Sequence, residues 1–174
     1  AATTLFVVPI VLFTVLSGAG LGALALMALA ELASRAVDVA WSPAQTSAAA
    51  IALALVIAGL CASTLHLANP RNAWRSAARW RSSWLSREAL AALAFIPVAG
   101  AYAALHALGA PSWTRALAVA TVLLAWAMLY CTAMIYASLK PVRQWHTARV
   151  PIAFFLLAHA SGVLLVACAM AAER

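Results

Sequence analysis

Charged residues are scarce in this chain of 174 residues: they make up 9% of it, and only four are acidic. Soluble globular domains carry about 25% charged residues. Hydrophobic residues instead make up 67% of the chain, and its mean hydropathy is +0.99. The composition therefore excludes an ordinary soluble domain and predicts that most of the chain lies in lipid.

Cysteine is sparse too, and the three that are present stand far apart inside apolar runs, at Cys61, Cys131 and Cys168. They lack Cys-x-x-Cys spacing and are odd in number, so neither a disulfide framework nor a zinc or iron–sulfur site fits them. We expect them to be small packing residues.

The four histidines do not pair as haem ligands. A haem b between membrane helices needs two axial His at matching depth. His66 ends the second apolar run, His159 lies well inside the last, His106 lies near the opposite boundary, and His146 is in a loop. We therefore expect no haem, no metal site and no redox centre in this chain.

Alternation of apolar and polar residues, which marks a membrane β-barrel, is also absent. Five apolar stretches instead reach the roughly 20 residues that a helix needs to cross a bilayer. They cover residues 5–33, 46–65, 89–108, 116–139 and 150–172. The sequence predicts an all-α, polytopic transmembrane helical bundle of five spans, forming a single anchor domain over residues 1–174.

Basic residues gather in two loops that the predicted spans place on one side of the membrane. The loop after the second span holds Arg71, Arg75, Arg79, Arg81 and Arg87, and the loop after the fourth holds Lys140, Arg143 and Arg149. The positive-inside rule makes this side cytoplasmic. A basic surface that docks an acidic partner would give the same pattern, so both interpretations stand.

Within the first basic loop, Arg71, Arg75 and Arg79 recur every four positions, so a helical turn or two would place them on one face. Trp80 and Trp84 have the same spacing. The pattern is typical of an interfacial helix that binds phospholipid or, alternatively, of a basic face that docks a partner. We expect membrane lipids and a protein as partners, not nucleic acid.

An imidazole and a carboxylate flank this loop. His66 lies where the second span leaves the membrane, because Pro70 stops any continuing helix. Ser86 is a suitable N-cap for the third span, which would place Glu88 in the first helical turn. Two such groups at one membrane boundary can handle protons, and ionisable groups near the membrane core are functional candidates.

Other polar features have alternative interpretations. Gly18 and Gly22 have the spacing that lets membrane helices approach closely, either inside this bundle or in a dimer. Glu31 and Arg35 are four residues apart, so we expect an ion pair.

Aromatic residues near the basic-side end of the fourth span form a second candidate region. Tyr130 and Tyr136 are either belt residues or walls of an amphipathic cavity. If His66 is only an interfacial side chain, the site must be sought around these tyrosines and His159.

The segment His66-Leu67-Ala68-Asn69-Pro70, followed by Ser86-Arg87-Glu88, resembles the signature of the membrane anchor subunits of the dimethyl sulfoxide reductase family. In that family a His-Leu-Gly-x-Pro segment precedes a Ser-x-Glu segment, and His66 and Glu88 have the family's spacing without a gap. Residues 131–137 and 143–145 also resemble it. Two features depart from the pattern: Ala68 replaces the usual Gly, and five predicted spans stand where the family normally has eight.

The resemblance implies a haem-free anchor that binds quinone, either ubiquinone or menaquinone. It implies an iron–sulfur subunit that docks beside the site, and a catalytic subunit that carries molybdenum bis-pterin. His66 and Glu88 would bind or deprotonate the quinol, and Arg79 would shape the site. The docking surface would contain Arg71, Arg75, Arg81, Trp84 and Arg87.

Residues 79–88 resemble most the anchors of cytoplasmic sulfite dehydrogenases, which pass electrons to quinone in the bacterial inner membrane. The alternative within the family is an anchor that oxidises quinol for a dimethyl sulfoxide or other anaerobic reductase. Two other classes stay open. A small transporter would need a polar path, although the spans show no internal repeat and no midplane acid. A structural anchor without a quinone site would tolerate replacement of His66 and Glu88.

Overall fold

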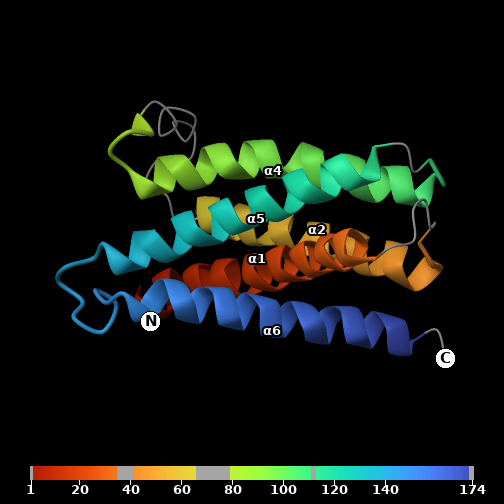
Figure 1. The fold of residues 1–174 in the computed structure, drawn as a ribbon. Coiled ribbons are helices and arrows are strands. Elements are labelled where there is room, and N and C mark those ends of the chain that lie inside the picture. Colours follow the sequence, from red (N-terminus) through yellow and green to blue (C-terminus); the bar gives the residue numbers. More distant parts are fainter. Residues whose placement is uncertain (1, 35–40, 66–78, 111–112, 173–174) are drawn as a thin grey trace.

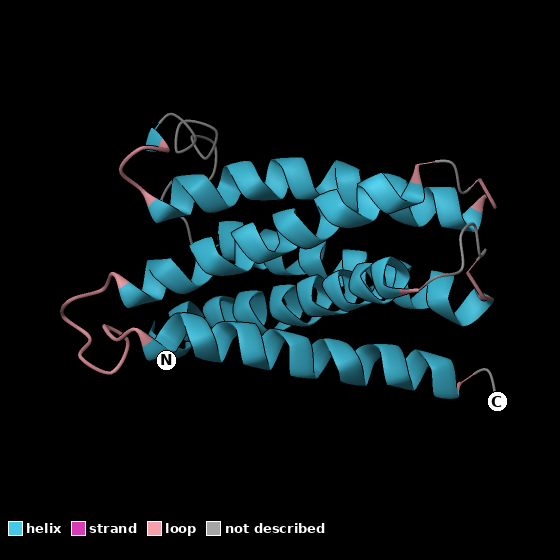
Figure 2. Ribbon diagram, viewed as in Figure 1, coloured by secondary structure: helices cyan, strands magenta, loops and turns pink. Residues whose placement is uncertain are grey.

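The computed structural model describes residues 2–34, 41–65, 79–110 and 113–172. Within these ranges the chain forms five α-helices and no strand (Figure 2). They are α1 (Ala2–Ala33), α2 (Pro43–Leu65), α4 (Trp84–Ala107), α5 (Thr114–Ala137) and α6 (Arg149–Ala171). All five are long and apolar enough to cross a membrane, which confirms the predicted all-α transmembrane bundle.

The helices begin one to five residues before the predicted spans, and the largest difference is at α4. Its N-cap is Ser83, not Ser86: Ser83 has extended backbone angles, and its hydroxyl accepts the N–H of Ser86 at 3.4 Å. The prediction that Ser86 caps this helix was wrong because three serines, Ser82, Ser83 and Ser86, precede the apolar run and each suits a cap by type. Glu88 consequently lies one turn further into the helix than expected.

Helix α1 is the centre of the bundle and contacts α2, α5 and α6. Its glycines allow this close packing. A Cβ at Gly22 would overlap the backbone carbonyl of Ala158 on α6, and a Cβ at Gly20 would overlap that of Ala52 on α2. Gly18 also faces Ala158, at ordinary contact distance. The internal-packing interpretation of Gly18 and Gly22 is therefore confirmed.

Successive helices run in opposite directions, so the described parts of both basic loops lie at the same end of the bundle (Figure 1). We call it the basic end; it holds Arg79, Arg81, Arg87, Lys140, Arg143 and Arg149. The opposite end holds the last turns of α1, α4 and α6 and the first turns of α2 and α5. Long apolar side chains on the outer surfaces of the helices are exposed, as a lipid-facing bundle requires.

Candidate functional site

Glu88 is buried at the basic end, on the inner face of α4. It is the fifth residue of that helix, and it is only 3% exposed. A carboxyl group removed from solvent at a membrane boundary is expensive unless it is hydrogen-bonded. A carboxylate in the first turn is stabilised by the helix dipole, but Glu88 lies beyond that turn. The dipole alone therefore does not account for the buried Glu88, which strengthens it as a functional candidate.

The partner of Glu88 is Thr132 on the neighbouring helix α5, 44 residues away in the chain. The Thr132 hydroxyl lies within hydrogen-bonding distance of Glu88 Oε1 and also of the Met128 carbonyl, at 3.0 Å from the latter. A hydroxyl has one proton and two lone pairs. It donates to Glu88 when the carboxylate is ionised, and it accepts from Glu88 and donates to Met128 when the carboxyl is protonated. The contact therefore suits both protonation states.

Arg87 braces the turn that leads into α4. Its Nε donates to the Trp80 carbonyl at 2.8 Å, and its Nη2 donates to the Arg81 carbonyl at 2.9 Å. The guanidinium also lies over the Trp84 ring, 4.2 Å from the centroid, and Trp84 contacts Tyr130 edge-on. Arg87 and Trp84 were predicted to face a partner. In the structure their contacts stabilise the turn before α4.

The exposed part of this turn consists of Arg79, Trp80 and Arg81. Trp80 is 51% exposed, and the Arg81 guanidinium lies 5.4 Å from the centroid of its ring. Arg79 and Arg81 are both exposed. His66, Arg71 and Arg75 lie outside the described residues, so their predicted roles stay predictions.

The second candidate region is not assembled as one site. Tyr130 is 45% exposed on the outside of α5, whereas Tyr136 packs against Trp145 and Phe154. His159 accepts from the Trp126 indole N–H at 3.2 Å, so its Nδ1 carries the proton donated to the Phe155 carbonyl, at 2.8 Å. Its imidazole is satisfied by α5 and α6 themselves.

A polar cluster at the opposite end was missed from the sequence. Glu31 Oε2 on α1 accepts from the Tyr102 hydroxyl at 2.6 Å and lies 2.8 Å from His106 Nε2, both on α4. The sequence predicted an ion pair of Glu31 with Arg35, a residue outside those described. The available signal was that Tyr102 and His106 are four residues apart, on one helical face, at the same boundary as Glu31.

Among the residues that the structure describes, no group of three or more His, Cys, Asp or Glu side chains could hold a metal ion. The absence of haem stays a prediction from the depths of the histidines.

The chain is similar to known membrane anchor proteins over nearly its whole length. Residues 2–174 match the family described as DMSO reductase anchor subunit (DmsC). The chain is also similar to a subunit of the sulfite dehydrogenase of Allochromatium vinosum, with 36% identity over 175 residues. That alignment covers 91% of this chain and 53% of the relative, so the chain spans about half of the relative's length. No solved structure matches.

Proposed function

The chain belongs to the family of DMSO reductase anchor subunits, and from this membership we propose that it is a haem-free quinone-binding anchor of a molybdopterin oxidoreductase. It exchanges electrons between a docked iron–sulfur subunit and the membrane quinone pool. The catalytic subunit of this complex carries molybdenum bis-pterin, and this chain supplies the membrane part.

The observation that carries the proposal is the buried Glu88–Thr132 pair beside an exposed basic turn. Reduction of a quinone to a quinol takes two electrons and two protons. The electrons come from the docked iron–sulfur partner. The protons come through His66 and Glu88, since the contact of Glu88 with Thr132 is satisfied with the carboxyl group either protonated or ionised.

Docking depends on positive charge at the same end. Arg79 and Arg81 are exposed and flank the exposed ring of Trp80, a composition typical of protein interfaces. Arg71 and Arg75 belong to the same loop. An acidic face on the iron–sulfur subunit would be attracted to this surface and brought next to the proton-handling residues.

The proposed direction is sulfite oxidation with quinone reduction, supported by the similarity to the sulfite dehydrogenase subunit. The basic end then faces the cytoplasm of a bacterium, with the chain in the inner membrane, in line with the positive-inside rule.

The direct test replaces His66 by Ala in the full complex. An imidazole titrates near neutral pH and can pass a proton to or from Glu88, which a methyl group cannot do. Quinone-linked turnover should be lost, while assembly and activity with a soluble artificial acceptor stay nearly unchanged. Quinone turnover within about twofold of wild type would make His66 an interfacial bystander and favour a purely structural anchor.

A further inference from the structure

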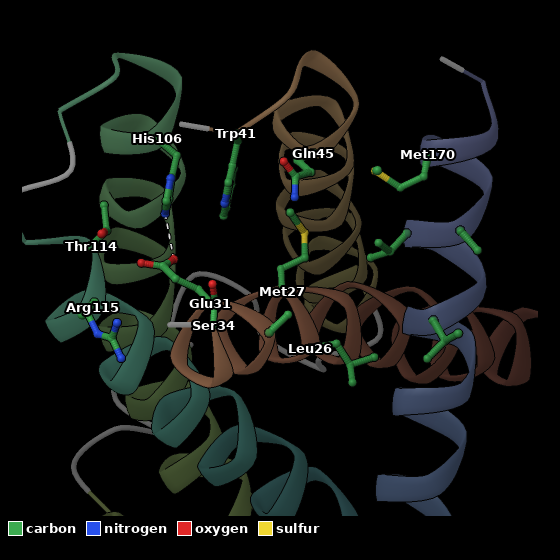
Figure 3. Close-up of a pocket in the computed structure, with 14 residues that line it drawn as sticks. Leu26, Met27, Glu31, Ser34, Trp41, Gln45, His106, Thr114, Arg115 and Met170 are labelled. Atoms are coloured by element: carbon green, nitrogen blue, oxygen red, sulfur yellow. Dashed lines mark hydrogen bonds and ion pairs between the residues drawn. The ribbon is translucent and has the colours of Figure 1, made fainter. Parts of the chain in front are cut away.

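The end of the bundle opposite Glu88 contains a cavity of about 720 Å³. Side chains from α1, α2, α4, α5 and α6 line it, together with Trp41 just before α2 (Figure 3). Its size is within the range of about 300–1,000 Å³ that small-molecule sites occupy. It is distinct from the Glu88 region, because Glu88 and His106 are eighteen residues apart on α4, about 27 Å along the helix axis.

One wall of the cavity is polar and held rigidly. The Trp41 and His106 rings are stacked, with centroids 4.0 Å apart and an interplanar angle of 2°, and Tyr102 meets both rings edge-on. Glu31 fixes this group from α1 through its bonds to Tyr102 and His106. The rings and the carboxylate are therefore pre-organised before any ligand arrives.

Gln45 adds a donor with a determined orientation. Its Oε1 accepts the N–H of Ser42 at 2.8 Å, and its own backbone N–H donates to the Ser42 hydroxyl at 3.2 Å, a reciprocal cap at the start of α2. Since the amide oxygen is held by Ser42, the NH₂ group points the other way. Figure 3 shows the Gln45 nitrogen on the side away from its oxygen, toward the Met27 side chain, and the Trp41 ring between His106 and Gln45.

The other wall is apolar and comes from α1 and α6. Leu26 and Met27 lie on the α1 side, and the α6 side is made of Val163, Val166, Ala167 and Met170. A molecule that fills the cavity thus meets hydrogen-bonding groups at one end and hydrocarbon at the other.

We propose that this cavity is a second binding site for a membrane quinone. Carbonyl oxygens of the headgroup accept from Gln45 and Trp41, and a quinol hydroxyl donates to Glu31, while the isoprenoid tail lies along α6. The lining carries one carboxylate, Glu31, and one guanidinium, Arg115, so its formal charges cancel, which suits an uncharged quinone headgroup; the test below separates a quinone from a phospholipid. The assignment is of binding only, and it stands on residues that the proposed Glu88 site does not use.

The test uses the full complex purified in detergent and an azido-substituted short-chain benzoquinone, with labelled peptides identified by mass spectrometry after illumination. We expect label at the end of the bundle opposite Glu88, in the last turns of α1 or α6 or in the first turn of α2. Ala167→Trp fills the cavity from α6 and should reduce this label by about tenfold or more. Ala160→Trp, exposed on the same helix but outside the cavity, and Glu88→Gln should leave it unchanged. Unlabelled decylubiquinone should protect the site, and added phospholipid should not.

A second variant guards against misfolding of the first. Gln45→Glu keeps the oxygen that accepts from Ser42 but removes the NH₂ donor. It should therefore also reduce the label at the end opposite Glu88 while preserving α2. The proposal is overturned if no peptide from the end opposite Glu88 is labelled in the wild type. It is also overturned if both variants leave this label within about twofold of wild type, or if phospholipid protects as well as decylubiquinone. Label that disappears only in Glu88→Gln would also overturn it.

Discussion

Replacement of Glu88 by Gln separates proton handling from packing. Glutamine has nearly the same size and shape, and its amide can still meet the Thr132 hydroxyl. It cannot take up or release a proton. The substitution thus leaves the contact between α4 and α5 in place and removes only the chemistry that the proposed function requires.

The two effects differ in size by enough to be told apart. Thr132 keeps the Met128 carbonyl as a partner in any variant, so its hydroxyl is not left without a hydrogen bond, and the free energy of unfolding should change by less than about 1 kcal/mol. A positioned proton donor or acceptor contributes about 10²–10⁴-fold to a rate. This corresponds to roughly 2.7–5.4 kcal/mol of barrier at 1.36 kcal/mol per factor of ten.

The assay compares turnover of the purified complex with decylubiquinone and with a soluble artificial acceptor, alongside thermal unfolding in the same detergent. Glu88→Gln should lose quinone turnover by about 100-fold or more and keep artificial-acceptor turnover. Glu88→Asp, which retains an ionisable group, should lose less than Glu88→Gln. Quinone turnover of Glu88→Gln within about twofold of wild type, a barrier change of ~0.4 kcal/mol, would refute the role of Glu88.

Three further outcomes are expected. Charge reversal of Arg79 and Arg81 together should weaken association with the iron–sulfur partner in a salt-dependent way, and stoichiometric co-purification at moderate salt would mean that they serve lipid instead. Gly22→Ala should destabilise the bundle by about 1–3 kcal/mol because the added Cβ would overlap the α6 backbone. Gly100→Ala should not, because the atom nearest to its added Cβ is 3.9 Å away. Equal melting temperatures of the two variants would contradict the packing described. A reduced-minus-oxidised spectrum of the complex should show no haem b band from this subunit, and a band that maps to its histidines would overturn the argument from their depths.

Several properties were determined by the sequence alone. Hydropathy and length locate a membrane helix because lipid demands about 20 apolar residues in succession, and this demand is local. The five helices therefore appear where the apolar runs predict them, and the alternation of spans places both basic loops at one end. The spacing of His66 and Glu88 also sufficed for the resemblance to the anchor family, which the match over residues 2–174 confirms.

The tertiary structure decided which polar side chains meet. Glu88 and Thr132 are 44 residues apart, and Glu31 and His106 are 75 apart. Whether such groups touch depends on the rotation and crossing of whole helices, and these are set by small residues such as Gly22 that let backbones approach. The partners of Arg87 were likewise decided by the folded structure. Its charge is evident from the sequence, but the turn before α4 directs both of its hydrogen bonds to nearby backbone carbonyls. A pattern of residue types along one helix carries no information about the facing surface of the next, so pairings across helices emerge only when the bundle packs.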